Sequence, residues 1–64
     1  MIEQVTAHFK GTQTAPDTVK FTHGGADFVL TDGTVYQNLD GQLGAGGKKV
    51  RTLAAVVKFV NARA

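Results

Sequence analysis

The chain has 64 residues and no cysteine, so disulfide bonds and thiolate metal sites are excluded. A chain of this length is expected to form one domain, residues 1–64, with a small core, because it buries only about 60% of the surface that its unfolded form exposes. Serine is absent as well, so two common catalytic nucleophiles are missing. Two histidines and scattered acids give no metal-ligand spacing. We therefore expect no enzyme, no metal and no cofactor.

The net charge of +2 is unevenly distributed along the chain. Residues 1–40 carry two lysines against five acids, a net charge of −3, whereas residues 41–64 carry five cations and no acid, a net charge of +5. This asymmetry indicates an anionic partner or a self-associating molecule, and a solubilising helix face would explain it equally well. With no signal-peptide pattern and no apolar run near the roughly 18 residues of a membrane span, we expect a cytoplasmic protein without membrane contact.

Alternating polar and apolar residues predict an antiparallel sheet in the first two thirds of the chain. We expect strands at about 2–10, 18–22, 26–31 and 34–39, forming a three- or four-stranded meander. Tight turns are predicted at His23-Gly24-Gly25 and at Asp32-Gly33, where hairpins need positive φ angles. The predicted apolar face consists of Val5, Phe9, Val19, Phe21, Phe28, Leu30 and Val35.

A helix at about 48–63 is predicted to cover this apolar face, after a glycine-rich loop at 41–47. The i, i+3, i+4 spacing of apolar residues favours a helix over a further strand. Its predicted core stripe is Val50, Leu53, Ala54, Val57, Val60 and Ala64. The expected fold is thus α+β, a β-meander followed by one C-terminal α-helix packed on the sheet.

Outside this stripe, the predicted helix carries an apolar edge of Val56 and Phe59 flanked by Arg63, and a basic ridge of Arg51 and Lys58. We expect Phe59 to be exposed in a monomer, and an exposed apolar patch usually marks an interaction site. Burial in an ordinary core is the alternative. A dimer would also give so small a fold additional stability.

The glycine-rich loop has two interpretations. It departs from the nucleotide-binding P-loop pattern at two positions, and the dinucleotide-binding fingerprint is absent. Glycines that lead into a helix N-terminus nevertheless leave free N–H groups for an anion. A phosphate contact at Gly46, Gly47, Lys48 and Lys49 is therefore one interpretation, and a mobile hinge is the other.

The sequence indicates two possible functions. The first is a small, homodimeric regulatory protein that binds a protein partner through Val56, Phe59, Arg51, Lys58 and Arg63, on the analogy of phage or mobile-element inhibitors of host machines. The second is a nucleic-acid-binding protein that uses the basic helix and the outward sheet face, with Lys20, Tyr36 and Asn38 as contacts. A purely structural, self-associating component is a third possibility.

Overall fold

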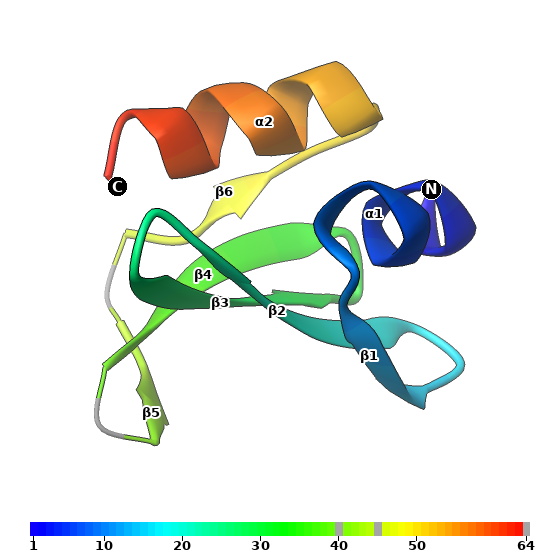
Figure 1. Ribbon diagram of the computed structural model, residues 1–64, viewed down its shortest axis with the longest axis horizontal. Helices are drawn as coiled ribbons and strands as arrows, with labels where there is room; N and C mark the ends of the chain where they lie inside the picture. Colours follow the sequence, from blue (N-terminus) through cyan, green and yellow to red (C-terminus); the bar gives the residue numbers. More distant parts are fainter. Residues whose placement is uncertain (40, 45, 64) are drawn as a thin grey trace.

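The computed structural model describes residues 1–39, 41–44 and 46–63. They form an α+β fold (Figure 1) with the elements α1 (Ile2–Phe9), β1 (Thr12–Ala15), β2 (Thr18–His23), β3 (Ala26–Thr31), β4 (Thr34–Leu39), β5 (Gln42–Leu43), β6 (Lys48–Lys49) and α2 (Leu53–Asn61). One antiparallel sheet has the order β1-β2-β3-β4-β5, and β6 also pairs with β4. The α+β class and the antiparallel meander are confirmed, whereas the prediction of one helix and three or four strands undercounts both.

The first segment is a helix, and the strand predicted at 2–10 is wrong. Val5 is fully buried in the core and Ile2 and Phe9 pack against it, which is the i, i+3, i+7 spacing of one helix face. Ala7 is exposed, so the apparent alternation did not mark a buried strand face. The helix ends at Lys10, whose φ of 54° and ψ of 44° are left-handed.

Two tight hairpins connect β2, β3 and β4, as predicted. Gly24 and Gly25 have φ angles of 59° and 82°, and Asp32 and Gly33 have 49° and 74°. Paired positive φ angles characterise the type I′ turn, whose twist matches that of the flanking strands. The register pairs Phe21 with Phe28 and Leu30 with Val35. The predicted inward residues of the three strands therefore share one face.

Two short strands pair along the same edge of β4. β5 pairs near its end, where Asn38 lies opposite Leu43, and β6 pairs near its start, where Thr34 lies opposite Lys49. The two registers are offset by two residues from those of one continuous strand. Gly46 and Gly47 therefore lead into a strand, β6, and not into a helix.

The C-terminal helix begins at Leu53, five residues later than predicted. Thr52 is its N-cap: the Thr52 hydroxyl accepts a hydrogen bond from the Ala55 N–H at 3.2 Å. Upstream, the Val50 N–H donates to the Gly33 carbonyl at 2.9 Å and extends the pairing of β6 with β4. Val50 is buried, but from an extended segment.

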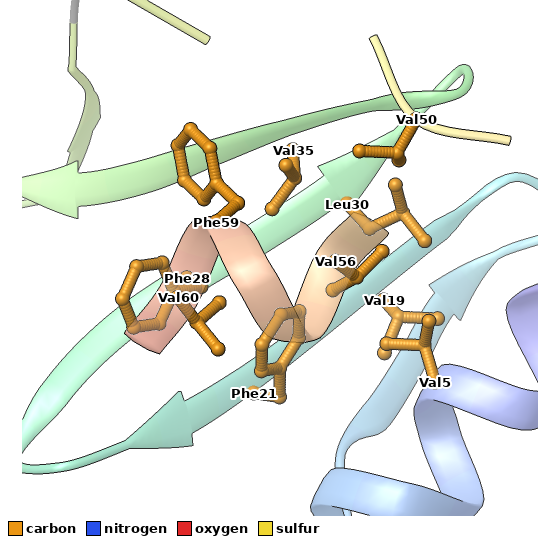
Figure 2. Packing of buried hydrophobic residues seen from close by; sticks show 10 residues of the cluster. All are labelled: Val5, Val19, Phe21, Phe28, Leu30, Val35, Val50, Val56, Phe59 and Val60. Carbon is orange, nitrogen blue, oxygen red and sulfur yellow. The ribbon is translucent and has the colours of Figure 1, made fainter. Parts of the chain in front are cut away.

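The core lies between the sheet and the two helices (Figure 2). Val56 is fully buried and Phe59 is 4% exposed, so the expectation that Phe59 is exposed in a monomer is wrong. The buried face of the helix is rotated about the helix axis relative to the predicted stripe. The bulkier Phe59 faces the sheet, while Ala54 is exposed and Val57 is half-buried. Ala64, also assigned to that stripe, lies outside the described residues. The cluster comprises Val5, Val19, Phe21, Phe28, Leu30, Val35, Val50, Val56, Phe59 and Val60.

Both helices pack on the same side of the sheet (Figure 1). Val5 of α1 and Val60 of α2 belong to one cluster with the inward residues of β2, β3 and β4. Within the described ranges, neither helix is long and apolar enough to cross a membrane. Neither of the two described helices covers the opposite side of the sheet, which we call the open face.

Candidate functional site

The open face is built by strand alternation, which turns every second residue of β2, β3 and β4 away from the core. Cross-strand pairing aligns these outward residues in rows, because residues that face each other across an antiparallel ladder point to the same side. The outward positions are Thr18, Lys20, Thr22, Asp27, Val29, Thr31, Thr34, Tyr36 and Asn38.

The central row of the open face contains Lys20, Val29 and Tyr36, which are register partners on three adjacent strands. Val29 is 4% exposed although it points away from the core. Its longer neighbours flank it on both sides, and the alkyl stem of a lysine commonly covers apolar surface in this way. The row therefore combines an apolar floor, an exposed ammonium group and a half-buried aromatic ring.

Tyr36 lies against the backbone of Gly47. A Cβ atom added at Gly47 would overlap the Tyr36 ring, so the ring packs where a side chain would otherwise stand. An aromatic ring over a glycine on a neighbouring strand is a known way to stabilise a sheet edge. This packing fixes Tyr36 on the open face.

The second row joins Thr22, Asp27 and Asn38, which pair across β2, β3 and β4. The Asn38 Oδ1 atom is buried and has no hydrogen-bond partner among the described residues. A buried acceptor without a donor costs the folded state about 1–3 kcal/mol, because the hydrogen bonds it makes with water in the unfolded chain are not replaced. Asn38 therefore offers a buried acceptor oxygen to which no described residue donates.

A depression of about 280 Å³ opens beside this row. Its polar lining comes from the α1–β1 junction and from the four strands β1 to β4: Lys10, Thr12, Lys20, Thr22, Asp27 and Asn38. Gly11, also in the lining, allows this arrangement, because a Cβ atom there would lie 2.8 Å from the Lys20 carbonyl oxygen. The close approach of the junction to β2 brings Lys10 to the depression. Lys10 was not among the residues predicted from the sequence.

The open face is mainly cationic. Lys10 and Lys20 line the depression and are exposed. Lys49 is also exposed, and it lies on this side because it pairs with Thr34. Asp27 is the acidic member of the outward set and lies in the depression. A phosphate group approaching from this side meets lysines along both margins of the sheet.

The residues predicted to bind a protein partner are not exposed together. Val56 and Phe59 are buried in the core. Arg63 lies over the Phe59 ring, with its guanidinium carbon 3.7 Å from the ring centroid, and donates to the Phe59 carbonyl at 3.3 Å. Arg51 and Lys58 are exposed. The structure therefore gives Arg63 an intramolecular role and leaves two cations without the apolar anchor.

The phosphate contact predicted at the glycine-rich loop loses its structural basis. Gly46, with a φ angle of 83°, and Gly47 precede β6, and Lys48 and Lys49 form that strand. None of these four residues lies at a helix N-terminus, since α2 begins at Leu53. Lys49 remains a candidate contact on the open face by its pairing.

Comparison with protein-family models, with curated proteins and with solved structures finds no match for this chain. Within the parts of the chain that the structure describes, no three histidine or acidic side chains gather as a metal site would require. The open face is accordingly the part of the molecule that indicates a function.

Proposed function

We propose that this chain is a small nucleic-acid-binding protein and that the open face of its sheet is the binding surface. The observation that supports the proposal best is the gathering of Lys20, Tyr36 and Asn38 on a sheet face that neither described helix covers. Each supplies one of the interactions that a nucleic acid offers: an ammonium group for phosphate, a ring for base stacking, and an amide for base edges.

Sheets bind nucleic acids in this manner in several folds, where exposed aromatic rings stack on unpaired bases and cations track the backbone. Here Tyr36 provides one stacking surface, Lys10 and Lys20 line the depression, and Lys49 lies at the edge of the sheet on the same side. With so few cations, the affinity is expected to be modest and sensitive to salt, with a dissociation constant of about a micromolar or weaker at physiological ionic strength.

The alternative of a protein partner held by the C-terminal helix stays a prediction. Its proposed anchor residues, Val56 and Phe59, are buried within the fold. The exposed cations Arg51 and Lys58 would have to act without them, and isolated surface charges contribute little binding energy.

Fluorescence anisotropy with labelled single-stranded and duplex oligonucleotides, at about 50 and 200 mM salt, tests the proposal. The matched variants are Lys20→Ala and Lys58→Ala, which remove the same charge from exposed positions on the open face and on α2. Lys20→Ala should weaken binding and flatten its salt dependence, whereas Lys58→Ala should change neither. Equal losses in both variants, or no binding at either salt concentration, would contradict the proposal.

A further inference from the structure

The depression on the open face has two chemically distinct sides. Asp27 and Asn38, which are cross-strand partners, contribute acceptor oxygens. Lys10 and Lys20 contribute ammonium groups. Thr12 and Thr22 hydroxyls complete the polar lining. This lining suits a ligand with N–H donors at one end and negative charge at the other.

Asn38 indicates which donor is missing. Its Oδ1 is buried without a partner, while its side chain lines the depression. A rotation of the amide would turn this oxygen toward the depression, where a ligand N–H group would donate to it. Binding would satisfy an atom that the free protein leaves unpaired, and this gain depends on the ligand having a donor at that point.

We propose that this depression is a subsite for one unpaired nucleobase that carries an amino group, with the adjoining phosphate held by Lys10 and Lys20. The inference rests on the proposed function and names the part of the nucleic acid that the open face selects. Cytosine N4, adenine N6 and the N1 and N2 groups of guanine are donors that Asp27 and Asn38 oxygens accept. Thymine and uracil carry the O4 carbonyl oxygen where cytosine carries its amino group, and their only donor on this edge is N3–H, so at that position an oxygen of the base faces the acceptor oxygens of the protein.

The size and position of the depression agree with a single base. Its volume of about 280 Å³ lies just below the range of pockets for drug-sized ligands, about 300–1,000 Å³. In a duplex the base is stacked within the helix and one hydrogen of its amino group is paired, so a subsite that receives a whole base requires an unpaired one. Tyr36 lies on β4 two residues before Asn38 and on the same face. Its ring is therefore placed to stack on the next base along the bound nucleic-acid strand.

The test uses short thymidine oligomers that differ only in one central nucleotide. Cytosine is compared with thymine, because the two rings have the same size and the N4 amino group replaces the O4 carbonyl. We expect the cytosine oligomer to bind about tenfold more tightly, the selectivity of one good base contact. Guanine and adenine at the central position should also exceed thymine.

Two variants separate base selection from general binding. Asn38→Leu should lower the affinity for the cytosine oligomer to that for the thymidine oligomer and so abolish the preference. The stability of this variant should not fall, because an unpaired buried acceptor is removed. Thr34→Val, an outward position of β4 away from the depression, should keep the preference. Loss of selectivity in the Thr34 variant as well would overturn the assignment to this depression.

The outcomes for the subsite and for the open face are distinguishable. Equal binding of all oligomers by the unchanged protein would overturn the subsite and leave the nucleic-acid proposal standing. No binding of any oligomer would overturn both.

As a second measurement, the ¹⁵N-labelled protein is titrated with cytidine monophosphate and with thymidine monophosphate. The amide signals of Thr22, Asp27 and Asn38 should shift more with cytidine monophosphate than with thymidine monophosphate. Shifts confined to α2 would contradict the subsite.

Discussion

The Tyr36 ring occupies the space above Gly47 that a side chain would otherwise take. The two residues come from β4 and from the segment just before β6, so their packing joins two parts of the sheet edge. Gly47 is exposed, yet it cannot accept a Cβ atom while Tyr36 remains in place. This contact links the stability of the edge to the aromatic ring that we assign to nucleic-acid stacking.

We predict that Gly47→Ala lowers the free energy of unfolding by about 1–3 kcal/mol, the usual cost of inserting a group into an occupied space. The cost should largely disappear in a Tyr36→Ala background, where the obstructing ring is absent. Urea denaturation of the two single variants and the double variant measures this coupling. Additive effects would show that Tyr36 and Gly47 do not interact.

Phe59 should be a stability residue. Its ring is 4% exposed and meets Phe28 edge to face at a centroid distance of 6.3 Å. Phe59→Ala is therefore expected to destabilise the fold by about 3–5 kcal/mol. Lys58→Ala, at the exposed neighbouring position, should stay within about 0.5 kcal/mol of the unchanged protein. A folded Phe59→Ala variant of undiminished stability would restore the idea of a surface anchor.

The fold was predictable where a local pattern had one interpretation. Alternation and turn chemistry fixed β2 to β4, because Asp32-Gly33 and the Gly24-Gly25 pair fit a tight turn and little else. The N-terminal helix was missed because Val5, Ala7 and Phe9 fit a strand, while Ile2, Val5 and Phe9 fit a helix. The exposed Ala7 distinguishes the two only after folding.

The start of α2 depended on a distant partner. Lys48 and Lys49 pair with β4, whose Thr34 and Val35 lie more than ten residues earlier, and no local periodicity reports that contact. For the site, alternation correctly placed Lys20, Tyr36 and Asn38 outward on one face. Lys10 was beyond reach, because its position follows from the left-handed end of α1.

Thr52 provides a direct check on where the C-terminal helix begins. Its hydroxyl accepts from the Ala55 N–H at 3.2 Å, so Thr52→Ala removes the N-cap and should cost about 1 kcal/mol. Thr52→Ser keeps the acceptor oxygen and should retain most of that stability. Arg51→Ala, at the preceding exposed position, is the matched control and should have little effect. Thermal unfolding followed by circular dichroism distinguishes the three variants.

Substitution of Gly11 should lower the stability of the fold and also weaken ligand binding at the depression. A Cβ atom there would lie 2.8 Å from the Lys20 carbonyl oxygen and 3.0 Å from a Val19 methyl carbon. Backbone cannot move aside as a flexible side chain can, so Gly11→Ala must push the α1–β1 junction away from β2. We expect a loss of about 1–3 kcal/mol in the free energy of unfolding.

Because the same junction brings Lys10 to the depression, the Gly11→Ala variant should also bind the cytosine oligomer more weakly than the unchanged protein under folding conditions. Thr14→Ala, an exposed substitution in the adjoining β1, should alter neither property. Urea denaturation and anisotropy on the same preparations measure both effects. A Gly11→Ala protein of full stability would contradict the close packing of the α1–β1 junction against β2.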